Sequence, residues 1–131
     1  MTTLRHLYRD LRGVAAIEFA IVAPVLLSLL LGMMQIGIIF QSSAGLKFAL
    51  DEAARLAIIY PQPTDDAIIS RFNAKRFGLD PAGLAVTVSH GTANGVGYAD
   101  INATYTTTLN FVFFTAPPIT LQETRRAFQP S

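Results

Sequence analysis

The residues with the clearest chemical potential stand at the start of a long apolar run. Gly13 precedes the run, and Glu18 is its one charged residue, followed by the aromatic Phe19. Glycine offers no side chain to a protease cleft and loosens a helix start, so it would leave the peptide bond after Gly13 open to a protease. A cut there creates an α-amino group on Val14. In a bundle of parallel helices, the Glu18 carboxylate of a neighbour shifted along the axis could pair with that group at low dielectric.

The apolar run, residues 14–40, is long enough to cross a bilayer. It reaches about 40 Å at a helical rise of about 1.5 Å per residue, against roughly 30 Å for a hydrocarbon core. A carboxylate at the bilayer centre costs on the order of 2.5 to 3.5 kcal/mol, but Glu18 lies only about 7 to 8 Å in. Glu18 is either an acid that is tolerated near the membrane interface or an acid that pairs with a positively charged group. Pro24, inside the span, predicts either a simple kink or a local unwinding.

Charges before the run indicate its orientation. They are Arg5, Arg9, Arg12 and Asp10. The arginine excess holds this flank in the cytoplasm, so residues 41–131 should lie across the membrane. A cleaved secretory signal is the alternative, because Ser42 and Ala44 form a small-x-small pair. The apolar region of such signals is usually about 7 to 15 residues long and uncharged, which fits this run poorly.

The same residues resemble the class III prepilin signal of type IV pilins. In that family a basic leader ends in glycine, and an aspartyl prepilin peptidase on the cytoplasmic face cuts after it. A glutamate at the fifth mature position precedes an aromatic residue. The resemblance implies a leader of residues 1–13, a cut between Gly13 and Val14, and assembly or recognition roles for Glu18 and Phe19.

The wider pattern is similar to the TadE-like family, pseudopilins or minor pilins of the tight-adherence (Tad or Flp) type IV pilus system. The matching positions are Gly13, Glu18, Phe19, Ala20, Pro24, Gly32, Gln35, Gly37 and residues 51–55. The resemblance covers about the first 55 to 60 residues. It implies pilus assembly and hence surface adhesion, with the prepilin peptidase, other pilin or pseudopilin subunits, the Tad inner-membrane platform and the lipid bilayer as partners. Gln35 stands where many relatives carry an acid, which weakens any role for charge there.

The resemblance also implies a location in the bacterial inner membrane, with a cytoplasmic N-terminus and a periplasmic C-terminal domain. The sequence does not decide whether the protein is incorporated into an extracellular pilus. It also does not decide whether the protein is of the TadE or the TadF type, or whether Val14 is methylated. The other reading is an uncleaved single-pass membrane protein whose outer domain binds an envelope partner.

Beyond the run, the helical pattern becomes amphipathic, and one helix is predicted from about Val14 to Ile59. Its apolar side carries Leu46, Leu50, Ala53 and Ala57. Asp51 and Arg55 are four residues apart and could pair on the other side. Pro61 and Pro63 should end the helix.

A second, shorter helix is predicted after these prolines. Thr64 should cap it, Asp65 and Asp66 should oppose its dipole, and Gly78 should close it. Ile68, Ile69 and Phe72 give it an apolar face for packing.

A change to a period of two then predicts strands over 84–89 and 98–106, joined by a glycine-rich connector. A third strand, from Ile119 to about Ala127, completes a small antiparallel sheet on the long helix. The expected architecture is α+β and pilin-like. The apolar stretch 109–118 either tucks into the core or stays exposed, at Phe113 and Phe114, as a patch for a partner or the bilayer.

Composition excludes several kinds of function. The 131 residues suffice for one domain, and the absence of cysteine excludes disulfides and thiolate metal sites. Two histidines exclude a multi-histidine metal site, so no metal or cofactor is expected. A net charge of +1 argues against nucleic-acid binding. The residue types of a hydrolase triad are present as Ser89, His90 and Asp100, but no nucleophile-elbow motif surrounds the serine. A structural subunit is therefore expected rather than an enzyme.

Overall fold

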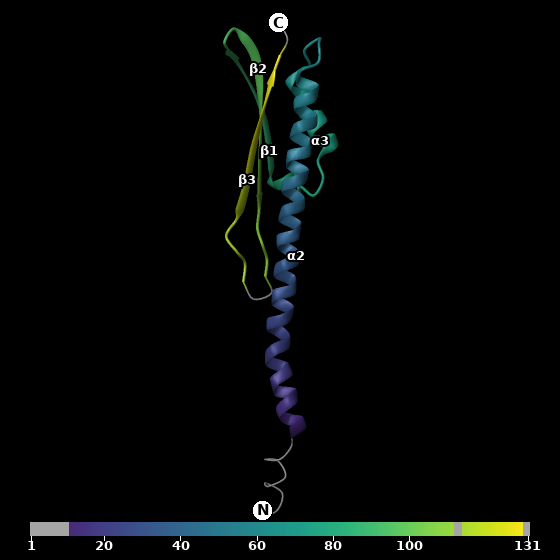
Figure 1. Ribbon diagram of the computed structural model, residues 1–131, viewed down its shortest axis with the longest axis vertical. Helices are drawn as coiled ribbons and strands as arrows, with labels where there is room; N and C mark the ends of the chain where they lie inside the picture. Colours follow the sequence, from purple (N-terminus) through teal and green to yellow (C-terminus); the bar gives the residue numbers. More distant parts are fainter. Residues whose placement is uncertain (1–10, 112–113, 130–131) are drawn as a thin grey trace, which may run out of the picture.

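The computed structural model describes residues 11–111 and 114–129, arranged along one long helix (Figure 1). Helix α2 spans Leu11–Ala57, 47 residues or about 70 Å. The later elements are α3 (Asp65–Lys75), the 3-10 helix η1 (Pro81–Gly83), β1 (Leu84–Ala93), β2 (Val96–Thr107) and β3 (Ile119–Phe128). The predicted α+β fold, with a long helix, a short helix and a three-stranded antiparallel sheet, is confirmed. Residues 1–10 of the expected leader lie outside the described residues.

Helix α2 divides by burial into two halves. Within the described stretch 13–41, no residue is buried, and Ser42 is the first that is. The helix ends two residues before the expected Ile59, because the Ile59 N–H donates to the Leu56 carbonyl (3.0 Å) and tightens the last turn. Pro61 follows too closely for the helix to resume.

The core lies between the second half of α2, α3 and one face of the sheet. Its largest fully buried side chains include Leu46, Leu50, Ile68, Phe72 and Ile101. Each such side chain stabilises the fold by about 1.5 to 3 kcal/mol through burial. Alanines at the contact allow the sheet to approach α2 closely: Ala49, Ala53, Ala57, Ala103 and Ala127. The predicted apolar faces of both helices are therefore the packed ones.

Helix α3 begins as predicted but ends earlier. The Thr64 hydroxyl accepts from the Ala67 N–H at 3.3 Å, and Asp65 and Asp66 occupy the first turn. The helix ends at Lys75, not next to Gly78, because Arg76 already has an extended backbone. Gly78 serves the following turn instead, with a φ of +65°.

The sheet has the order β1-β2-β3, with both neighbouring pairs antiparallel. The predicted connector 90–97 is wrong, since both strands continue into it and leave only Asn94 and Gly95 as the turn. Their φ values of +53° and +80° suit a two-residue hairpin turn whose twist matches the strands. Gly91 pairs with Tyr98, and a Cβ atom on Gly91 would collide with that ring. The glycine therefore serves strand pairing rather than a loop.

The connection between β2 and β3 runs back along α2 toward its N-terminal half (Figure 1). An isolated bridge joins Asn110 and Thr115 beyond the regular strands. This extension brings Phe111 and Phe114 to the exposed apolar half of the helix. Phe113 lies outside the residues that the structure describes.

Candidate cleavage segment and assembly surface

The five predicted site residues all lie on the exposed first half of α2. Gly13 and Val14 are the third and fourth residues of the helix, and a Cβ atom on Gly13 would meet nothing within 4 Å. Glu18 is exposed, and the Phe19 side chain is 74% exposed. The side chains that follow Gly13 are therefore accessible from outside the molecule. The helix begins at Leu11 and runs through Gly13, so the glycine does not loosen the helix start as expected.

Glu18 and Val14 are separated by four residues, about one helical turn, so they lie on the same face of α2. Ala15, Glu18, Phe19 and Val22 line a shallow surface hollow. The carboxylate thus stands beside an apolar depression, next to the position where cleavage would create an ammonium group.

Pro24 lies inside α2, and the helix continues through it. Proline has no N–H, so the carbonyl one turn earlier loses its usual helical partner. The Ser28 hydroxyl donates to the Pro24 carbonyl at 2.7 Å, which adds a local hydrogen bond to this part of the helix.

The first half of α2 presents large apolar side chains on all sides. Among the described residues, one helix is long and apolar enough to cross a membrane, and this half contains its apolar stretch. Leu26, Leu29 and Met33 are each more than half exposed. The helix fits a single-pass membrane anchor.

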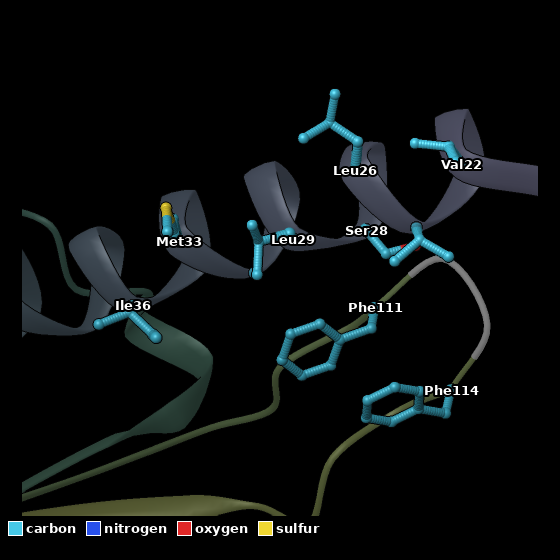
Figure 2. A pocket seen from close by; sticks show the side chains of 10 residues that line it. Val22, Leu26, Ser28, Leu29, Met33, Ile36, Phe111 and Phe114 are labelled. Carbon is cyan, nitrogen blue, oxygen red and sulfur yellow. The ribbon is translucent and has the colours of Figure 1, made fainter. Parts of the chain in front are cut away.

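Gln35 and Gly32 position the β2–β3 loop on this helix. The Gln35 side-chain amide donates to the Asn110 carbonyl. A Cβ atom on Gly32 would lie 3.2 Å from Cε1 of Phe111, so the glycine allows the ring to approach. Figure 2 shows Phe111 and Phe114 facing the helix near Ser28. The loop is thus neither in the core nor free of the helix, an outcome between the two predicted alternatives.

Ion pairs tie the second half of α2 to the rest of the domain. The predicted Asp51–Arg55 pair is wrong: Asp51 binds Arg125 of β3 (2.7 Å), and Arg55 lies 3.4 Å from Glu52. The partner of Asp51 comes from a strand far away in sequence, so spacing along the helix could not reveal it. The Asp51 carboxylate raises the pKa of Arg125 through their hydrogen bond.

Glu52 also binds Arg71 of α3 at 2.7 Å. Hydrogen bonding from Arg71, assisted by Arg55, holds the Glu52 pKa below its ordinary value. This pair links α2 to α3 outside the apolar core.

The structure does not bring Ser89, His90 and Asp100 together as a hydrolase triad. His90 Nε2 lies 2.7 Å from the Asp65 carboxylate, whereas the Ser89 hydroxyl donates to the Asp100 backbone carbonyl at 3.5 Å. The Asp100 carboxylate accepts two hydrogen bonds from Arg126, both 2.7 Å, and this lowers its pKa. The guanidinium also stacks on Tyr98, 3.9 Å from the ring centroid. These side chains therefore make structural contacts between strands and to α3.

Residues 13–55 match the family model described as TadE-like protein, which is about a third of the chain. This match confirms the resemblance seen in the sequence, and it includes Gly13, Glu18, Phe19 and Pro24. The comparison with curated proteins and the comparison with solved structures found no match. In the part of the chain that the structure describes, no group of three or more histidine, cysteine, aspartate or glutamate residues is placed to hold a metal ion.

Proposed function

We propose that this protein is a pseudopilin, or minor pilin, of a Tad pilus, and that a prepilin peptidase processes it between Gly13 and Val14. One observation carries the proposal. The TadE-like match begins at Gly13 and includes Glu18 and Phe19, which lie on an accessible helix end. Glycine before the cut and an apolar helix after it are the parts that this processing would use, whereas the Glu18 carboxylate, one turn beyond Val14, is assigned to assembly.

Glu18 is proposed to set the register between subunits. In a parallel bundle, a neighbour shifted by about one helical turn, or about 6 Å, brings its Val14 ammonium beside Glu18. Phe19 and Val22 line the same hollow as Glu18, so packing of a neighbouring helix against it would exclude water and strengthen the attraction. Because the pair must also be desolvated, it specifies register more than it adds stability.

The membrane arrangement is part of the same proposal. Residues 14–40 would span the inner membrane, with the leader in the cytoplasm and residues 41–131 in the periplasm. Burial that begins at Ser42 supports this division. A secretory cut after Ala44 would fall inside α2, next to Gly45, which packs against the segment after α3.

A Glu18→Ala variant tests the assembly role. The variant should be inserted and cleaved like the unmodified protein, yet crosslink poorly to the pilus subunits expressed with it. Ile21→Ala, a change on the same exposed half of α2, is the matched control and should retain crosslinking. Normal co-assembly of the Glu18 variant would contradict the proposal.

A further inference from the structure

We propose that the β2–β3 loop enters the outer half of the hydrocarbon core beside helix α2, with Phe111 near the outer boundary and Phe114 deeper. The chain would then contact the bilayer twice, through helix α2 and through this loop. The inference goes beyond the proposed function. It rests on α2 spanning the membrane and not on cleavage at Gly13.

The loop lies at the appropriate height along the helix. Phe111 and Phe114 share a groove with residues on α2 from Val22 to Ile36 (Figure 2). Gly32, against which Phe111 packs, is 18 residues beyond Val14, or about 27 Å. With Val14 at the inner boundary of a hydrocarbon core of about 30 Å, Phe111 lies close to the outer boundary. Phe114 lies deeper, at the level of Leu26 and Ser28 (Figure 2).

Helix α2 and the β2–β3 hairpin both lack charged residues where they run side by side. Helix α2 carries no charged residue over 19–46, and the hairpin carries none over 101–122. Lys47 and Glu123 are the first charges beyond these two stretches, and they form an ion pair at 3.4 Å. This ion pair lies about 50 Å along the helix from Val14, outside the hydrocarbon core, so neither segment carries a charge into the core on this side.

Hydrogen bonds within the loop also reduce the free-energy cost of moving its backbone polar groups from water into lipid. The Phe111 N–H donates to the Phe114 carbonyl, and the Ala116 N–H to the Leu109 carbonyl, both at 2.8 Å. Gln35 donates to the carbonyl of Asn110. Pro117 and Pro118 have no N–H to satisfy. Paired backbone groups of this kind are what a segment needs at the edge of a lipid phase.

The two rings present apolar surface without belonging to the core. Phe114 is 63% exposed, and its ring stacks on Phe111 with centroids 4.7 Å apart. Neither side chain is a member of the buried core cluster. Phenylalanine is wholly apolar, and its transfer into the hydrocarbon core is favourable. A bilayer around α2 already reaches this height, so lipid covers the rings without any further partner.

Tryptophan fluorescence of the full chain in vesicles tests the proposal, because the chain contains no tryptophan. Phe114→Trp is compared with Leu26→Trp on the spanning half of α2 and with Tyr60→Trp, whose site is 78% exposed beyond the end of α2. The vesicles contain equal parts of phosphatidylcholine and phosphatidylglycerol. The acyl chains are brominated either near the headgroup or near the chain end.

Phe114→Trp should show blue-shifted emission and should be quenched by deep bromine about as strongly as Leu26→Trp, because both sites lie at the same level of α2. Tyr60→Trp should lose no fluorescence with bromine at either position. If Phe114→Trp is quenched as little as Tyr60→Trp, the proposal is overturned. Protection that disappears when the protein is diluted in lipid would assign the groove to the helix of a second copy and also overturn it. Loss of quenching at Leu26 as well would show that α2 itself does not span.

Discussion

Gly45 in helix α2 packs directly against the backbone carbonyl of Phe77, in the segment that follows α3. A Cβ atom on Gly45 would collide with that oxygen, so the two segments meet at backbone distance. The Phe77 ring extends the contact to Phe48, with centroids 5.9 Å apart. This contact fixes how the segment after α3 sits on the long helix, next to the Ser42 hydroxyl that donates to the Gly78 carbonyl.

Replacing Gly45 with alanine should destabilise the domain although alanine favours helices. Forcing a methyl group into this contact moves backbone atoms, which typically costs about 1 to 3 kcal/mol. Gly37→Ala is the matched control, because its Cβ atom meets nothing within 4 Å and the change should be neutral or stabilising by up to about 1 kcal/mol. Urea denaturation in detergent micelles, followed by the tyrosine near-ultraviolet signal, measures both. Equal stability of the two variants would refute the close contact.

The β1–β2 turn should depend on the positive φ at Asn94. Valine there places a branched side chain in a left-handed conformation, and we expect a loss of about 1 to 2 kcal/mol in the free energy of unfolding. Asn94→Gly keeps the conformation accessible and should be nearly neutral. Thermal denaturation of both variants checks this. A valine variant as stable as the glycine variant would mean that the turn is not formed as described.

Acid should weaken the fold through Asp100. The two hydrogen bonds from Arg126 hold its pKa below the ordinary 3.8, so the folded state binds the proton less readily than the unfolded state. The stabilisation is therefore present above the unfolded pKa and is lost as the pH falls through the lower, folded pKa. Glu52, whose pKa Arg71 lowers, acts in the same direction.

Denaturation midpoints measured from neutral pH down to about pH 3 should decline less steeply in Asp100→Asn than in the unmodified protein. Asp66→Asn is the control, since no ion pair joins Asp66 to another described residue. An unchanged slope in the Asp100 variant would contradict the assigned role of its pair with Arg126.

Residues that repeat with a clear period were predictable from the sequence. Leu46, Leu50 and Ala53 follow the helical period, so their burial against the sheet was predicted and is observed. The pairing of Asp51 with Arg125 was not predictable, because periodicity gives the face of an element but not its partner across the fold. The Asn94–Gly95 dipeptide is a hairpin signal that could have located the turn, but the surrounding glycines favoured a longer loop.

The candidate site also contains features that depend on local spacing and features that depend on contacts across the fold. Gly13 and Glu18 could be singled out from the sequence because their proposed roles depend on local spacing along one helix. The contact of Phe111 with Gly32 depends on how far the β2–β3 hairpin extends along α2, which requires the register of the strands. The missing side chain of Gly32 is a sequence signal for a close approach, but it does not identify the approaching ring.

The N-terminal mass of the protein, isolated from membranes with and without the cognate prepilin peptidase, tests the central claim most directly. The account predicts a chain that begins at Val14 only when the peptidase is present. An intact Met1 start under both conditions would contradict it and leave an uncleaved single-pass membrane protein with an outer binding domain. A start near Gly45 would contradict it in favour of a secretory signal.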